Sequence, residues 1–340
     1  MKARRSFLGV TYNGSEITAS LRKYLIGWSY TDYLSGQINH LEIDLQDKDH
    51  LWMTSWMPKK GDWLKVAINL QHWPKENQMK RKNLGAFEID HIQLAGPPST
   101  VTIKALAVPE SKAIRGQDRN KAWEGTSLKS IASEVAGRAG LQLFYDTNEN
   151  PSYDRIEQSG ESDIVFLHRL CVKEGLAMKI EAKKLVILEE RKYEQRPIIR
   201  TLQRKRDIDE IISYEFESTM TDVYRSCIVT HQDSDKKTTI KGSFTPPNPP
   251  PTTKVLYVNE EAKSGGEANK IARKKLREKN KDAVTGSITV IGNPMYYGGA
   301  TIRLQRFGEF DGKYIITEVT HSKSKGYVTE LKIRKCLEGY

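Results

Sequence analysis

The chain has 340 residues, of which 38% are hydrophobic and 29% are charged, and its formal net charge is +11 at pH 7. This length allows two or three domains with separate cores, but no run of residues approaches the ~20 apolar positions of a membrane-spanning helix. The basic N-terminus lacks the apolar stretch of a secretory signal, and the net charge is compatible with nucleic acid, an anionic surface or an acidic protein as partner.

Residues 1–116 predict one β-barrel domain. Turn sequences such as Asn13-Gly14 and Gly96-Pro97 separate short runs of apolar or alternating residues. The runs lie at 7–12, 25–30, 38–45, 63–70, 86–94 and 101–107. Several short strands at this spacing are typical of a barrel or a sandwich, and we favour an antiparallel barrel.

Residues 117–200 predict a small α+β domain. A first helix begins at Thr126 or Ser127, where a hydroxyl can cap it, and ends at Gly140. Residues 141–145 then predict a strand. The domain continues with a second helix and a hairpin.

That second helix has clear start and stop signals. We expect the Ser162 side chain to cap it, and Asp163 lies in the first turn, where the helix dipole favours an acid. Gly175 can adopt the left-handed conformation that ends a helix. Two short apolar runs, 176–180 and 184–188, predict the hairpin.

Residues 201–340 predict a second β-barrel domain. It carries a proline-rich loop at 245–251, which cannot donate to a strand ladder and should be extended. It also carries a basic helix at 266–281. The predicted fold is therefore α+β and mainly β, with two antiparallel β-barrel domains flanking the small α+β domain.

Three strands of the first region echo three strands of the last. The series are Gly61-Asp-Trp-Leu-Lys-Val, Gly85-Ala-Phe-Glu-Ile-Asp and 101–105, against Gly299-Ala-Thr-Ile-Arg-Leu, Gly312-Lys-Tyr-Ile-Ile-Thr and 328–333. Internal duplication explains this echo, and so does the general likeness of antiparallel meanders. The sequence leaves both explanations open.

Motifs for catalysis, cofactors and metals are missing from the sequence. It has no Walker loop, no H-E-x-x-H and no G-x-S-x-G, and its seven histidines share no metal-ligand spacing. Cys171, Cys227 and Cys336 lie too far apart for a zinc site or a disulfide framework, and they fit a reducing compartment. The acidic run 42–49 lacks the EF-hand order. We therefore predict no catalytic residues, no cofactor and no metal site.

A group of large apolar side chains is a candidate for contacts with other proteins. Trp52, Trp56 and Met57 lie in a predicted loop, where such residues are often interface anchors. The alternative is that some of these residues fill the barrel. Trp63, on an alternating strand, is the best candidate for the core.

The basic residues form a second group of candidates. Arg273 and Arg277, on the basic helix at 266–281, are interface candidates. Two further basic runs lie at 59–82 and 191–206. Charge runs of this kind are usually solvated. We expect them to face outward or toward acidic neighbours.

The middle domain contains Glu161-Ser-Asp-Ile-Val-Phe-Leu-His-Arg-Leu followed by Glu174-Gly-Leu and a hairpin. On these residues it resembles the phage late control gene D family, the baseplate hub proteins of contractile tails and of VgrG spikes. Ala122-Trp-Glu-Gly-Thr-Ser-Leu, Leu84-Gly-Ala-Phe-Glu-Ile-Asp and Phe310-Asp-Gly-Lys-Tyr-Ile-Ile-Thr-Glu-Val-Thr-His extend this resemblance over nearly the whole chain. It implies two barrels of the tail-tube type in one polypeptide.

The resemblance also implies an assembly. A homotrimer would offer six barrels to a sixfold tail tube and three identical faces to a threefold spike. The chain ends at Tyr340 after the last predicted strand, so a separate trimeric spike protein is expected. The other implied partners are the tail tube protein and further baseplate and tape-measure proteins, with DNA passing at most transiently and no membrane insertion. The implied location is the baseplate of a virion or tail-like particle, after synthesis in the bacterial host cytoplasm.

Three functions compete at this point. A structural hub without enzyme activity is favoured by the resemblance and by the missing motifs. A tail-tip cell-wall hydrolase is the alternative, although no catalytic constellation supports it. A basic nucleic-acid-binding module ranks third, because the basic runs lack interleaved aromatic residues.

Overall fold

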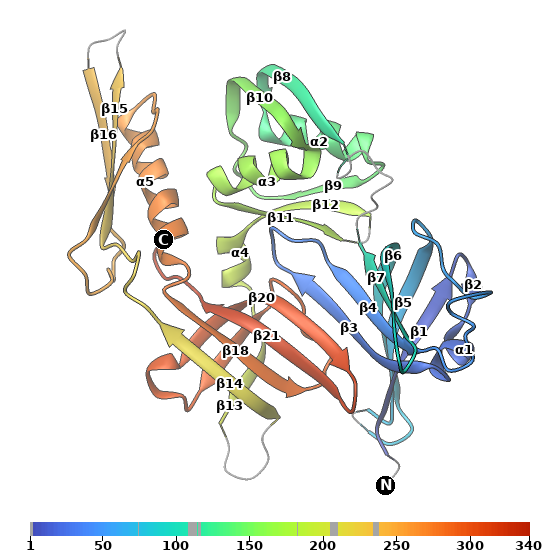
Figure 1. Ribbon diagram of the computed structural model, residues 1–340. Coiled ribbons are helices and arrows are strands. Elements are labelled where there is room, and N and C mark those ends of the chain that lie inside the picture. Colours follow the sequence, from blue (N-terminus) through green and yellow to red (C-terminus); the bar gives the residue numbers. More distant parts are fainter. Residues whose placement is uncertain are drawn as a thin grey trace.

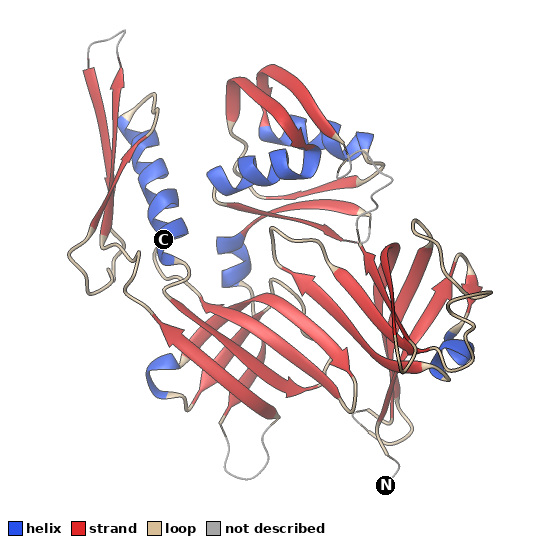
Figure 2. Cartoon of the chain, in the orientation of Figure 1, coloured by secondary structure: helices blue, strands red, loops and turns tan. Residues whose placement is uncertain are grey.

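The computed structural model describes residues 3–73, 75–107, 114, 117–181, 183–204, 210–233 and 238–340. Strands account for 52% of the chain and helices for 16%, which confirms the α+β, mainly β class. Figure 2 shows a large curved sheet with the longer helices above it.

The first region forms seven strands and one short helix. They are β1 (Arg5–Tyr12), β2 (Ser15–Glu16), α1 (Thr18–Arg22), β3 (Leu25–Tyr33), β4 (His40–Gln46), β5 (Trp63–Gln71), β6 (Met79–Ala95) and β7 (Thr100–Leu106). In β1 and β4, buried residues alternate with more exposed ones, because successive side chains of a strand point to opposite faces.

The middle region contains two helices packed on small sheets, followed by a short third helix. Its elements are β8 (Asp118–Ser127), α2 (Leu128–Arg138), β9 (Gln142–Asp146), β10 (Ser152–Ser162), α3 (Asp163–Lys173), β11 (Leu176–Glu181), β12 (Lys184–Glu189) and α4 (Glu190–Gln195). The predicted helices, strand and hairpin are present, and β8 pairs with β10 in addition. One detail was wrong: Ser162 occupies the N-cap of α3 but makes no capping hydrogen bond.

The last region returns to strands. Its elements are β13 (Ile198–Gln203), β14 (Ile211–Ser218), β15 (Ser226–Asp233), β16 (Thr238–Phe244), β17 (Val255–Asn259), α5 (Gly265–Asn280), β18 (Val284–Ile291), β19 (Thr301–Gln305), the 3-10 helix η1 (Gly308–Phe310), β20 (Gly312–Lys323) and β21 (Tyr327–Lys335). Helix α5 is the predicted basic helix. It packs on β15 and β16, in an insertion between β14 and β18.

The two outer regions share one 13-stranded sheet. Its order is β14-β18-β21-β20-β3-β4-β7-β6-β5-β1-β2, and β19 links β13 to β20. The first half, β1 to β7, meets the second half where β20 pairs with β3 (Figure 1). Each half has its own core, which contains Ile43 and Phe87 in the first and Ile288 and Tyr314 in the second.

The two halves repeat one strand order. The first half runs β1-β5-β6-β7-β4-β3 and the second runs β13-β19-β20-β21-β18-β14. Two of their register irregularities also match: Ile89/His91 in β6 with Ile316/Glu318 in β20, and Leu25/Gly27 in β3 with Ile211/Ser213 in β14. The shifts between β5 and β6 and between β13 and β19 have no counterpart in the other half. The halves differ at one end, because β1 is antiparallel to β5 whereas β13 is parallel to β19.

The hydrogen bonds at the matching bulges repeat as well. Gly61 N–H donates to Ile89 O at 2.8 Å in the first half, and Gly299 N–H donates to Ile316 O at 2.8 Å in the second. An ordinary meander has no reason to place the same bulges and the same bonds at corresponding positions. Of the two explanations of the sequence echo, the structure favours duplication.

Two expectations stay predictions. Within the described residues, no ladder joins β3 to β1 or β2, or β13 to β14, so closure of either half into a barrel is not established. The division into domains is also untested. Its boundary after residue 116 lies beside residues outside the described ranges, and its boundary after residue 200 falls inside β13.

Candidate assembly surfaces

The joint between the halves continues the sheet without a gap. Its register places Thr31 opposite Thr320 and Tyr30 opposite His321. The two threonine hydroxyls are hydrogen bonded at 3.0 Å, and the rings of Tyr30 and His321 stack with centroids 6.2 Å apart. Tyr30, Thr31 and His321 are buried, so the joint is packed as tightly as a core.

His321 is a neutral member of this joint. Burial lowers the pKa of His321 to about 3, and the charge of Lys82 acts in the same direction. Nε2 lies 3.3 Å from the Tyr296 carbonyl, which can only accept, so Nε2 carries the proton. Nδ1 lies 3.0 Å from the Tyr327 hydroxyl and 3.2 Å from that of Thr329.

A buried ion pair ties the middle domain to the joint. Lys179 Nζ on β11 lies 3.0 Å from Asp32 Oδ1 on β3, and both side chains are at most 6% exposed. Asn39 and the Gly298 backbone N–H also donate to this carboxylate, each at 2.9 Å. Burial disfavours the charged ammonium, but the carboxylates of Asp32 and Glu181 outweigh it and raise the pKa of Lys179. One carboxylate thus holds β3, β11 and the segment before β19 together.

A second buried network contains the predicted interface residue Arg277. Its Nη2 lies 2.6 Å from Glu194 Oε1 on α4, and Arg334 Nη1 on β21 lies 2.6 Å from the same oxygen. Arg334 also pairs with Glu190 at 2.5 Å. The Arg277 side chain is 12% exposed. Arg277 therefore binds its own chain and offers little surface to another protein.

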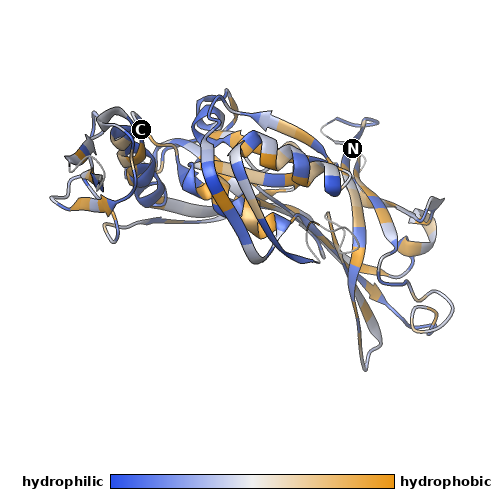
Figure 3. Cartoon of the chain, turned by 90° about the horizontal axis from the view of Figure 1, so that it is seen from above, coloured by the Kyte–Doolittle hydropathy of each residue, from blue (hydrophilic) through white to orange (hydrophobic). Residues whose placement is uncertain are grey.

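Other cations of α5 also meet acids or carbonyls of the same chain. Lys274 Nζ lies 3.0 Å from Glu174 and 3.2 Å from Glu149, both in the middle domain. Arg273, the other interface candidate on this helix, donates to the Tyr340 carbonyl at 2.8 Å. Figure 3 shows α5 as a mainly hydrophilic helix. Acids and carbonyls of the same chain thus bind much of the positive charge of α5. Part of the basic run 191–206, namely residues 205–206, lies outside the described ranges.

The tryptophan loop divides between core and surface. Trp52 is only 6% exposed and belongs to the first core, whereas Trp56 and Met57 are 39% and 40% exposed. The structure therefore favours the core alternative for Trp52. Trp63, expected in the core, is half-buried and lies outside it. Trp56 and Met57 border an apolar cavity of about 310 Å³, and their contact with a partner stays a prediction.

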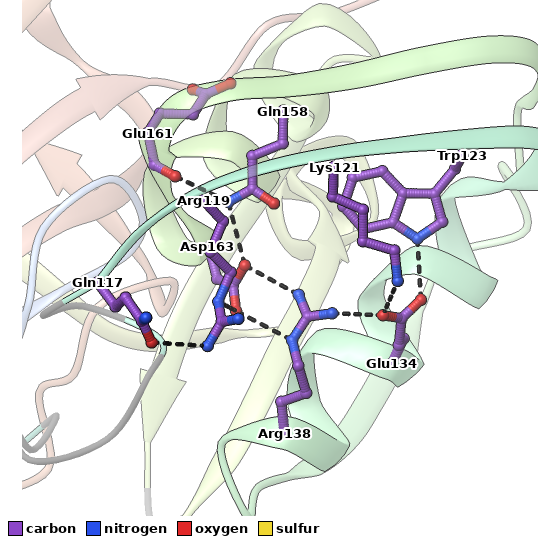
Figure 4. A network of polar contacts seen from close by, with 9 residues as sticks. All are labelled: Gln117, Arg119, Lys121, Trp123, Glu134, Arg138, Gln158, Glu161 and Asp163. Atoms are coloured by element: carbon purple, nitrogen blue, oxygen red, sulfur yellow. Dashed lines mark hydrogen bonds and ion pairs between the residues drawn. The ribbon is translucent and has the colours of Figure 1, made fainter.

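Two acids of the middle domain, Asp163 and Glu134, lie in a network of structural pairs (Figure 4). Asp163 is fully buried and receives two hydrogen bonds from Arg138, at 2.9 and 3.3 Å, and a third from Gln158 at 3.1 Å. Trp123 Nε1 donates to Glu134 at 2.9 Å, and Arg138 also bonds Glu134. This network locks α2 onto α3, and both of its carboxylates are engaged in structural contacts.

Two searches of the described ranges gave negative results. No group of three or more His, Cys, Asp and Glu residues there is placed to hold a metal ion. No helix in the same part of the chain has the length and apolar character that a membrane crossing requires.

The buried charges at the joint could not be located from the sequence. Asp32 and Lys179 are 147 positions apart, and Glu190 and Arg334 are 144 apart. A lysine between the apolar residues Met178 and Ile180 is a signal for a buried ion pair, because a buried cation needs an acid. The sequence cannot say which of its many acids is the partner.

Known proteins similar to this chain include phage tail proteins. A family model described as the phage tail baseplate hub (GPD) matches residues 89–327. A probable baseplate hub protein of Escherichia phage 186 is 28% identical over 181 residues, which cover 53% of this chain and 44% of that relative. The match therefore spans less than half the length of the relative.

Two solved structures have a similar fold along the whole chain. The tail protein from Neisseria meningitidis MC58 matches with a TM-score of 0.73 at 13% identity, over 97% of this chain and 96% of that one. The 43 kDa tail protein of prophage MuSo2 from Shewanella oneidensis matches with a TM-score of 0.71 at 14% identity, over 98% and 99%. At these identities the likeness shows the fold alone.

Proposed function

Because the chain belongs to the phage tail baseplate hub (GPD) family, we propose that it is a structural baseplate hub that connects a sixfold tail tube to a threefold spike as a homotrimer. Its partners are then the tail tube protein, a separate trimeric spike protein and other baseplate and tape-measure proteins. The site of action is the baseplate of a virion or tail-like particle.

One observation carries this proposal: a single chain contains two sheet halves with the same strand order and matching bulges. A ring of six similar units cannot match a trimer subunit for subunit. Three copies of a chain with two similar halves offer six similar units on one side and three identical chains on the other. The duplication thus has the form that a symmetry adaptor requires.

The proposal includes the absence of enzyme activity. Asp163 is paired with Arg138, and Glu134 is paired with Lys121 and accepts a hydrogen bond from Trp123, so neither carboxylate of that network is free to act on a substrate. Zymography on peptidoglycan tests this point directly. A lytic band from purified protein would contradict the proposed structural role and support the alternative, a tail-tip cell-wall hydrolase.

Light scattering tests the assembly. We expect purified protein to have the mass of three chains, and averaged electron microscopy images to show threefold symmetry with six similar units around a ring. A chain that stays monomeric at all accessible concentrations contradicts the homotrimer. Particles with twofold symmetry would contradict it as well.

A further inference from the structure

A recess lined by cations lies between the two halves, near the N-terminus. Its volume is about 460 Å³, and no aspartate or glutamate is among the described residues that line it. The first half contributes Arg4, Arg5 and Arg22, and the second half contributes Lys323 and Lys325. Figure 1 places the N-terminus at the end of the large sheet that lies away from the middle domain and α5. The recess exists only because the joint brings both halves together.

The five cations of the recess have no acidic partners. Within the described ranges, none of them takes part in an ion pair. The Arg4 guanidinium lies over the Trp73 ring, 4.9 Å from its centroid, and the Arg22 guanidinium lies over the Phe7 ring at 5.0 Å. The Lys323 ammonium donates to a backbone carbonyl. Rings and carbonyls thus hold these cations in place without neutralising them, in contrast to the cations of α5.

The inner part of the recess is electrostatically unfavourable for its own cations. Burial lowers the pKa of the half-buried Lys323, and the charge of Arg22 lowers it further. A carboxylate in the recess would favour the charged lysine, because an opposite charge within a few ångströms stabilises it. Several cations around one concave surface also concentrate positive potential there. The recess therefore favours an anionic ligand.

Apolar side chains border the same surface. A second cavity, of about 620 Å³, adjoins the recess and shares Arg4 and Ile291 with it. Ile291 is 42% exposed, and Met295, which also lines the second cavity, is 38% exposed. Glu210, the only acid among the described residues that line this cavity, is paired with Arg200. The surface thus combines positive charge with exposed apolar area.

We propose that the recess binds an acidic segment of another protein, whose apolar side chains cover Ile291 and Met295. The carboxylates of the segment meet guanidinium and ammonium groups, with which they form charge-assisted hydrogen bonds. Nucleic acid fits less well, because its phosphates match the cations but leave the two apolar side chains uncovered. A second copy of this chain also fits less well, because each copy carries a net charge of +11.

This proposal goes beyond the hub function and does not depend on the homotrimer, because one chain supplies the whole recess. Light scattering in the buffer of the binding experiment separates the two proposals. A monomer that binds the acidic peptide described below contradicts the homotrimer and supports the recess. A trimer that does not bind the peptide supports the homotrimer and contradicts the recess.

Fluorescence anisotropy with labelled probes tests the class of ligand. The first probe is a peptide of four Glu-Glu-Leu repeats. Two comparison probes carry the same eight charges: a peptide of four Glu-Glu-Ser repeats, and a single-stranded DNA with eight phosphates. We expect the Glu-Glu-Leu peptide to bind at least tenfold more tightly than either, and more weakly as the salt concentration rises. Equal or tighter binding of either comparison probe would overturn the proposal.

Charge reversal tests the location of the site. Arg5→Glu with Lys325→Glu changes one exposed residue of each half. We expect this double variant to bind the Glu-Glu-Leu peptide at least tenfold more weakly and to melt at the parental temperature. Lys184→Glu with Lys241→Glu is the matched control, since it changes the net charge equally at exposed residues outside the recess, and it should keep the parental affinity. Equal losses in both variants would show that the net charge of the chain attracts the peptide, which would overturn the site.

A third variant tests the apolar contact. Ile291→Ser should lower the affinity for the Glu-Glu-Leu peptide at least threefold and leave the affinity for the Glu-Glu-Ser peptide unchanged, because only leucine buries apolar area there. Val165→Ser, at a residue of α3 that is 53% exposed, is the control and should change neither affinity. An Ile291→Ser variant that keeps the parental preference for leucine would contradict the proposed contact.

Discussion

The two halves of the large sheet have the same strand order but different surroundings. In the first half, the outer edge of β3 is covered by β20, and Asp32 at its end binds Lys179 of the middle domain. In the second half, the outer edge of the corresponding strand β14 has no partner strand among the described residues, and Ser218 at the place of Asp32 is exposed. One ladder can therefore serve as an internal joint in one half and as a free edge in the other, depending on what covers it.

The interiors of the two halves can be compared residue by residue. Each half buries an aromatic residue from an irregular segment, Trp52 after β4 and Tyr296 after β18. Phe216 occupies the place of Tyr30, and the residue beside it in the next strand is Gly286 where the first half has Leu41. The backbone pattern is kept, while a glycine of the second half replaces a leucine of the first beside the aromatic ring.

The largest expected effect concerns the buried ion pair between Asp32 and Lys179. Lys179→Met leaves the Asp32 carboxylate buried without its counter-ion, which should lower the free energy of unfolding by about 3 to 5 kcal/mol. Chemical denaturation of the monomer measures this loss. Lys104→Met, which breaks the exposed pair with Glu42, is the control and should cost less than about 1 kcal/mol. Similar losses of unfolding free energy in both variants would show that the buried pair of Asp32 and Lys179 stabilises the chain no more than an exposed pair does.

The second prediction separates core from surface in the tryptophan loop. Trp52→Ala should lower the free energy of unfolding by about 3 kcal/mol, the low end for a buried tryptophan, because a loop can partly collapse around the gap. Trp56→Ala should cost less than Trp52→Ala, since its side chain is 39% exposed. Thermal melting of the two variants gives the comparison. A larger loss for Trp56 would reverse the assignment of core and surface.

The third prediction tests the close contact between Gly286 on β18 and Phe216 on β14. A Cβ on Gly286 would lie 2.5 Å from a ring carbon of Phe216 and 2.7 Å from the Glu215 carbonyl oxygen. Gly286→Ala should therefore cost about 2 kcal/mol through overpacking. Gly326→Ala, at a position with no neighbour within 4 Å, is the control. If both variants melt at the parental temperature, β14 is not packed against β18 in this way.

The last prediction concerns pH and the joint. The pKa of His321 is lowered to about 3 in the folded chain from an ordinary value of 6.5. Between these two pH values the unfolded chain binds a proton at His321 and the folded chain does not. This contribution to stability is complete above pH 6.5 and is lost as pH falls toward 3, at about 1.4 kcal/mol per pH unit.

Denaturation at a series of pH values checks this slope. We expect His321→Gln to reduce the loss of stability between pH 6.5 and 4.5, because glutamine takes up no proton. His50→Asn, at an exposed residue, should leave the slope unchanged. A His321→Gln variant with the parental slope would place the pH dependence elsewhere.

Local patterns in the sequence were sufficient for most elements. Alternating apolar residues predicted the strands of both halves, and Gly140 and Gly175 predicted the ends of α2 and α3, because these signals depend only on neighbouring residues. The basic helix was predicted to within one residue at each end. The echo between the β regions was visible too, although duplication and coincidence looked alike until the strand order and bulges were known.

The tertiary structure decided what those elements do to one another. The joint between β3 and β20, the Asp32 and Lys179 pair, and the burial of Arg277 and Trp52 all depend on residues far apart in the chain. A strand pattern specifies which face is apolar, but it does not specify which strand lies beside it, because every strand edge presents the same N–H and C=O groups. For that reason the pairing of β3 with β20, which joins the two halves, became visible only in three dimensions.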